Sequence, residues 1–125
     1  MHNFKKIKWI LQALAQPAHI QISLFPNFVN VADELALEWG ECFDLVNRKW
    51  DFFSSDQLML IRSLDAQIVK MSGVFNISLW NNEALSSACE WQVVRQLAKE
   101  LLDIFEWNFE EPSMIDAIYV GPKKG

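Results

Sequence analysis

Residues 28–47, FVNVADELALEWGECFDLVN, carry the pattern that decides the fold. Large apolar or thiol side chains recur there every three or four positions, at Phe28, Val31, Leu35, Trp39, Cys42 and Val46. This spacing places them along one face of an α-helix, and such a face must be buried against another apolar surface. The stretch therefore predicts a long amphipathic helix in a mostly helical protein.

Three further segments on either side of this helix show the same spacing. They are residues 3–15, a segment that begins at Ser54 or Ser55, and residues 82–107. Ser54 and Gln57 are spaced as a capping box, in which each residue bonds the other's backbone. Asn81 or Asn82 is suited to cap the last helix. The four segments together predict an arrangement like a four-helix bundle.

Shorter segments alternate apolar and polar residues with a period of two, which is typical of strands. They are residues 19–25 (HIQISLF), 74–80 (VFNISLW) and 114–120 (MIDAIYV). We expect the first and third to pair at an edge of the bundle, and the second to be a strand or an extended connector. The predicted fold is one mostly α domain over residues 1–125, with two or three short edge strands and a frayed tail at 121–125.

The composition narrows the class of protein. The chain has 125 residues, of which 51% are hydrophobic, and its net charge is −5. An acidic chain repels nucleic-acid phosphates, so we expect no direct nucleic-acid binding, whereas a basic protein partner suits this charge. No apolar run reaches the length of a membrane span. Cys42 and Cys89 fit buried, reduced thiols, which favours a cytoplasmic protein.

Three glutamates in the opening stretch, Glu34, Glu38 and Glu41, fall along one face of the predicted helix. A carboxylate metal site in a ferritin-like bundle would also need Glu-x-x-His on partner helices. The chain has no such motif, and these glutamates are predicted to lie opposite Trp39 and to face water. We therefore expect no metal or cofactor there, and the alternative use of this face is contact with a basic partner.

Trp50 lies in NRKWDFF, between a basic pair and two phenylalanines, in the loop that follows the opening helix. This position favours either a contact point for a partner or a plug over the end of the bundle. The sequence contains no nucleophile, phosphate-loop or metalloprotease motif, and its two cysteines lack a neighbouring base. We therefore expect a protein that is not an enzyme.

The segment QISLF, residues 21–25, resembles the pentapeptide by which bacterial proteins dock on the DNA sliding clamp. The resemblance implies that Leu24 and Phe25 fill an apolar pocket while Gln21 bonds at its rim. Ile22 stands where leucine is more usual. The alternative is a half-buried strand with Ile22 and Leu24 turned inward.

Three function hypotheses follow. The first is a small, acidic, non-enzymatic protein-binding module of the bacterial cytoplasm, for example an inhibitor or immunity protein. The second is a clamp-associated factor that uses residues 21–25, which requires this segment to be exposed. The third is a small enzyme, which requires a polar pocket with His19 close to Cys42 or Cys89.

Overall fold

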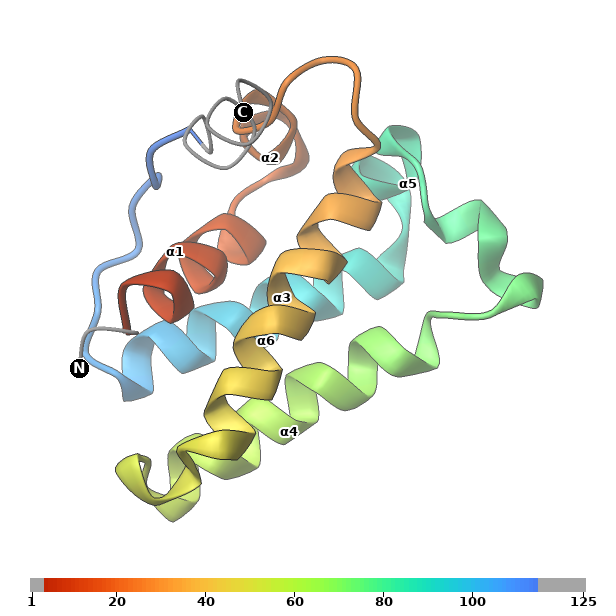
Figure 1. Ribbon diagram of the computed structural model, residues 1–125. Coiled ribbons are helices and arrows are strands. Elements are labelled where there is room, and N and C mark those ends of the chain that lie inside the picture. Colours follow the sequence, from red (N-terminus) through yellow and green to blue (C-terminus); the bar gives the residue numbers. More distant parts are fainter. Residues whose placement is uncertain (1–3, 115–125) are drawn as a thin grey trace, which may run out of the picture.

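The computed structural model describes residues 4–114, which form α-helices and short 3-10 turns (Figure 1). The α-helices are α1 (Phe4–Ala15), α2 (Ala18–Ser23), α3 (Val31–Arg48), α4 (Ser55–Lys70), α5 (Asn82–Ser87) and α6 (Cys89–Ile104). The 3-10 segments η1 (Trp50–Phe52) and η2 (Val74–Leu79) lie before and after α4. The prediction of a mostly helical, bundle-like fold is confirmed.

Helix α6 is the centre of the packing, because it lies against both α1 and α4, while α3 packs mainly on α1 (Figure 1). Each of the four long helices gives the core a leucine with no exposed surface, namely Leu11, Leu35, Leu64 and Leu101. Burying one such side chain contributes about 1.5–3 kcal/mol. The apolar faces read from the sequence are therefore what holds the long helices together.

Side-chain caps fix where several helices begin. Ser54 accepts a hydrogen bond from the Gln57 backbone, and the Gln57 side chain accepts one from the Ser54 backbone, so the predicted capping box is present. The Asn81 side chain accepts from the Ala84 backbone at 2.8 Å, which starts α5. These bonds satisfy backbone donors that a helix N-terminus leaves free.

The predicted long helix over residues 82–107 is wrong in one respect, because it is broken in two. Ala88 has an extended backbone, with φ −82° and ψ 134°, and it separates α5 from α6. The break lets both pieces bury an apolar face, since Leu85 before it and Trp91 after it are completely buried. A continuous helix would fix the relative directions of these two side chains.

The predicted strand over residues 19–25 is also wrong, because most of this segment forms the helix α2. Pro17 precedes the helix, and its carbonyl accepts hydrogen bonds from the backbone of Ile20 and Gln21 at 3.0 Å. The buried positions Ala18, Gln21 and Phe25 follow a helical spacing rather than the alternation. Both periods are present in this sequence, and packing against the core selects the helical one.

Residues 74–80 are likewise not a strand, because Val74–Leu79 form the 3-10 segment η2. No strand occurs within residues 4–114. The predicted strand over residues 114–120 lies, apart from its first residue, outside the described part of the chain, as does the tail 121–125. The two edge strands that fall in the described part are therefore corrected to helical turns.

Among residues 4–114, none of the helices is both long enough and apolar enough to cross a lipid bilayer.

Candidate protein-binding surface

The three residues of the clamp-like segment are all buried. Gln21 has no exposed surface, and its amide donates hydrogen bonds of 3.1 Å to the carbonyls of Ala13 and Leu14 at the end of α1. Leu24 and Phe25 belong to the core, where Phe25 meets Trp9 edge-on at 6.0 Å between ring centroids. Docking by this segment would require all three side chains to leave the core.

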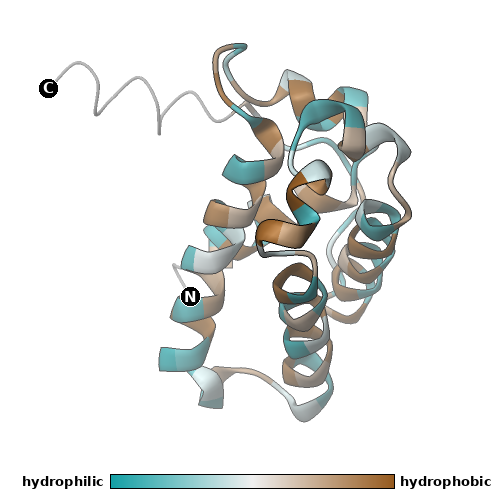
Figure 2. Cartoon of the chain, turned by 90° about the vertical axis from the view of Figure 1, so that its right-hand side faces the viewer, coloured by the Kyte–Doolittle hydropathy of each residue, from teal (hydrophilic) through white to brown (hydrophobic). Residues whose placement is uncertain are grey.

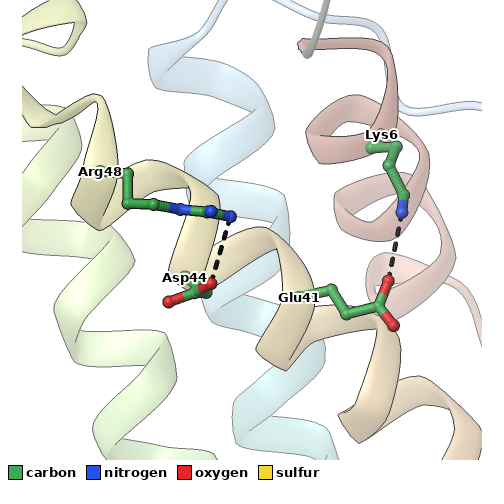
Figure 3. Close-up of polar contacts among 4 residues, drawn as sticks. All are labelled: Lys6, Glu41, Asp44 and Arg48. Carbon is green, nitrogen blue, oxygen red and sulfur yellow. Dashed lines mark hydrogen bonds and ion pairs between the residues drawn. The ribbon is translucent and has the colours of Figure 1, made fainter.

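The glutamates of α3 occupy three different environments and do not share one solvated face. Glu41 pairs with Lys6 of α1 at 3.2 Å (Figure 3), and Glu34 is half-buried. Glu38 is only 8% exposed, which corrects the expectation that it faces water. Burial raises the pKa of the Glu38 carboxyl, and the nearby charge of Glu41 raises it further.

Two of the acidic side chains of α3, Glu41 and Asp44, form ion pairs within the chain. The hydrogen bond from Lys6 to Glu41 raises the pKa of the Lys6 ammonium, which keeps the pair ionised. One turn further along α3, Arg48 pairs with Asp44 at 3.2 Å (Figure 3). Across the described residues, no group of three or more histidine, cysteine or acidic side chains is placed to hold a metal ion.

The two cysteines differ in exposure. Cys42 is buried as expected, and this burial raises the pKa of its thiol to about 12. A thiol with that pKa stays protonated at neutral pH and is a poor nucleophile. Cys89, at the start of α6, is exposed, so the expectation that both thiols are buried is wrong.

The loop around Trp50 contains both a plug and an exposed aromatic pair. Phe53 is the plug, because it is buried between Phe4, at 5.2 Å, and Phe105, at 6.1 Å between ring centroids. Trp50 and Phe52 instead point away from the core and are largely exposed. Trp50 is therefore not the plug and lies at the surface.

A second exposed apolar group lies at the opposite end of α4, in η2. Phe75 is 97% exposed, Val74 76% and Ile77 73%, and we call these three residues the η2 knuckle. In Figure 1 this segment extends away from the bundle at the right, beyond the end of α4. Figure 2 views the molecule from that side, and the short turn in its foreground is coloured as hydrophobic. Soluble proteins rarely expose such large apolar side chains side by side, except where they bind something.

Hydrogen bonds hold the turn that carries the η2 knuckle in place. Within the turn, the Asn76 side chain donates to the carbonyls of Lys70 and Ser72, at the exposed end of α4, at 3.3 and 3.1 Å. At its end, the Trp80 ring donates to the Met71 carbonyl at 2.9 Å and packs edge-on against Trp91. The turn thus has a defined shape, although the side chains of Val74, Phe75 and Ile77 are mostly exposed to solvent.

The sequence prediction missed the η2 knuckle because the alternation in VFNISLW suggested a half-buried strand. The residue in the sequence that indicates the correct structure is the glycine just before this segment. Gly73 has φ 107° and ψ 160°, a conformation restricted to glycine, and it turns the chain sharply out of α4. Val74, Phe75 and Ile77, which follow this turn, are all exposed, whereas a half-buried strand would bury the side chains on one of its faces.

A comparison of the chain with protein-family models, curated proteins and solved structures finds no significant match. Any functional assignment therefore rests on the geometry of this chain.

Proposed function

We propose that this protein is a non-enzymatic protein-binding module that inserts the η2 knuckle into an apolar groove of a partner protein. The observation that carries the proposal is the near-complete exposure of Phe75 within a well-anchored turn. An exposed phenylalanine in a flexible tail would have little meaning. One held outward by hydrogen bonds on both sides has the features of a binding anchor.

The energetics of such an anchor are favourable. Transferring one exposed valine, isoleucine or phenylalanine side chain from water into a partner's groove contributes about 1.5–3 kcal/mol. Because Asn76 and Trp80 already fix the backbone of the turn, little conformational entropy is lost on binding. These three side chains can therefore supply a large part of the affinity of a modest interface.

The net charge of the chain and the loop around Trp50 also support this proposal. The net charge of −5 attracts a basic partner over long range and accelerates association, which supports the expected basic partner. Trp50 and Phe52 supply a second exposed aromatic contact at the other end of α4. An inhibitor or immunity-type protein that plugs its target's groove is one form of this function. No observation favours the sliding-clamp hypothesis, since Gln21, Leu24 and Phe25 are buried.

The test places a photo-crosslinking phenylalanine analogue at position 75 and, as a matched control, at position 37, where Leu37 is also exposed. Both proteins are irradiated in a native lysate, and crosslinked chains are identified by mass spectrometry. We expect one protein to be captured from position 75 and not from position 37. Purified, it should bind the wild-type chain and bind the Val74→Ser/Ile77→Ser variant much more weakly.

A control variant with the same loss of apolar surface elsewhere, Leu37→Ser/Met59→Ser, should bind the captured partner normally. Equal binding by the two double-serine variants would overturn the assignment of the η2 knuckle as the anchor. If position 75 captures a second copy of this chain, and analytical ultracentrifugation shows a dimer, the η2 knuckle mediates self-association and the proposal of a foreign partner is wrong.

A further inference from the structure

Arg95, in the middle of α6, is partly buried. The sequence places it on the outer face of its helix, but its guanidinium bonds backbone carbonyls of neighbouring elements. Nε donates to the Gln16 carbonyl at 2.9 Å, and Nη2 donates to the Leu85 carbonyl. Nη2 also lies 3.4 Å from the side-chain oxygen of Gln21. Arg95 therefore joins the ends of α1 and α5 to α6.

The positive charge of Arg95 has no acidic counterpart in the described part of the chain. The ion pairs found there are Lys6 with Glu41 and Arg48 with Asp44. Desolvation is the cause that lowers the pKa of Arg95, as expected for a cation moved away from water. Carbonyl dipoles at the ends of α1 and α5 compensate part of this charge, but they do not neutralise it.

Arg95 is also one of the residues that line an open cleft. The cleft has a volume of about 290 Å³ and is lined by Pro17, Ala18, His19, Ser86 and Arg95. Nη1 of Arg95 makes no hydrogen bond to residues 4–114, so its two donors are available, and its orientation is fixed by the bonds of the other two nitrogens. His19 and Ser86 are exposed and add a ring nitrogen and a hydroxyl at the rim.

We propose that this cleft binds a small oxyanion, a phosphate or carboxylate group, with Arg95 as its main ligand and His19 and Ser86 at its rim. Because Nε and Nη2 are occupied within the chain, Nη1 is the nitrogen left to donate charge-assisted hydrogen bonds to oxygen atoms of such an anion. The cleft, at about 290 Å³, is slightly smaller than typical small-molecule sites of about 300–1,000 Å³, which suits a single anionic group. This inference is independent of the η2 knuckle.

The energetics of a partly buried arginine also favour binding of an anion. Nε and Nη2 of Arg95 bond three acceptors within the chain, which leaves the donors of Nη1 over. The arginine costs desolvation energy and leaves donors unused in the chain itself. Binding an anion would compensate this cost, because the attraction between the charges is strong where water is partly excluded.

The test is an NMR titration of the full chain with sodium phosphate and, separately, sodium acetate, each against sodium chloride at the same ionic strength. We expect saturable shifts of the Arg95 side-chain and His19 ring signals that fit one dissociation constant. Saturation with phosphate, with acetate or with both supports the site, and the stronger probe identifies the preferred group. If phosphate and acetate cause only the shifts that chloride causes, the cleft binds an adventitious ion only, and the proposed site is wrong.

Two variants with the same change in charge make the test specific. Ser86→Glu places a carboxylate at the rim of the cleft, whereas Ser87→Glu places one on the next residue of α5, which does not line it. We expect Ser86→Glu to weaken binding of the better probe by about tenfold or more, and Ser87→Glu by no more than about twofold. Equal effects of the two would overturn the site. Neither variant removes Arg95, so the test does not depend on a destabilised protein.

Discussion

The segments at residues 18–25 and 74–80 are both short helical turns that connect longer helices. The first buries its large apolar side chains, whereas the second exposes most of them. In the first, α2 and the residues after it bury Gln21, Leu24 and Phe25 against the core. In the second, η2 turns Val74, Phe75 and Ile77 outward. The number of apolar residues in a turn therefore does not decide whether they are buried. The position of the hydrogen bonds that hold the turn in place decides it.

The fastening points of the two turns explain their orientation. Gln21 lies inside its turn and bonds carbonyls at the end of α1, which draws the turn's apolar side chains into the core. In η2 the corresponding bonds are made by Asn76, to the end of α4, and by Trp80, which packs against Trp91 just beyond the turn. Trp80 packs against the core, whereas Val74, Phe75 and Ile77 before it remain exposed.

The largest expected effect comes from removing the same ring from each turn. Phe25→Ala should lower the free energy of unfolding by about 3–5 kcal/mol, because it leaves a cavity beside Trp9. Phe75→Ala should change it by less than about 0.5 kcal/mol, because its ring touches almost only water. Urea denaturation followed by tryptophan fluorescence and circular dichroism measures both.

The same pair of variants also separates stability from binding. Phe75→Ala should lose the partner captured by crosslinking while it keeps the wild-type unfolding midpoint. If both substitutions destabilised the protein by similar amounts, Phe75 would be part of the core, and the contrast between the turns would be wrong.

The sequence predicted the long helices well because their apolar residues repeat over many turns and agree with their caps. The Ser54 capping box was correct, and so was the stripe on α3 from Val31 to Val46. The prediction was wrong at Phe28, which lies in a turn before α3 and is 73% exposed. The two short turns were predicted wrongly because six or seven residues fit a period of two and a helical period equally well. Packing chose between them, through Pro17 and Gln21 in one turn and Gly73 and Trp80 in the other.

The candidate site was harder to predict than the fold, because exposure depends on how helices turn relative to one another. Glu38 and Arg95 both fall at positions that read as solvent-facing on a helix wheel. Glu38 is covered in the folded chain, and Arg95 reaches back to the carbonyl of Gln16. For Trp50 the sequence left a surface position and a plug both open, and the structure shows the side chain exposed.

A second test exchanges the amide that fastens each turn for an apolar side chain of similar size. Gln21→Leu should lower the free energy of unfolding by about 1–3 kcal/mol, because buried carbonyls at the end of α1 lose a donor and no water replaces it. Asn76→Leu should cost less than about 1 kcal/mol, since water reaches the carbonyls of Lys70 and Ser72. Chemical denaturation of both variants checks this order, and a larger loss for Asn76→Leu would contradict it.

A third test concerns the backbone that directs η2 outward. Gly73→Ala should lower the free energy of unfolding by about 1–2 kcal/mol, because φ 107° is unfavourable for any residue with a Cβ atom. No atom lies within 4 Å of the position a Cβ would take, so the cost comes from the backbone alone. Gly40→Ala is the matched control, because Gly40 is helical and equally open, and there alanine should stabilise by about 0.5–1 kcal/mol. Thermal denaturation should therefore show shifts of opposite sign.

The smallest effect is electrostatic, and it contrasts the buried Gln21, whose amide is hydrogen-bonded, with the buried Glu38. Burial raises the pKa of Glu38 above its ordinary value of 4.5, so the folded protein holds this proton more tightly than the unfolded chain does. The stability that protonated Glu38 contributes is fully present below its ordinary pKa of 4.5, and it is lost as the pH rises through the raised pKa of the folded protein. Glu38→Gln removes this loss, so it should be more stable than the wild type at pH 7, and the gain should disappear near pH 4. Glu111→Gln removes one negative charge from an exposed residue and controls for net charge. A gain for Glu38→Gln that is the same at every pH, or equal to that of Glu111→Gln, would show that burial of Glu38 costs the folded protein nothing.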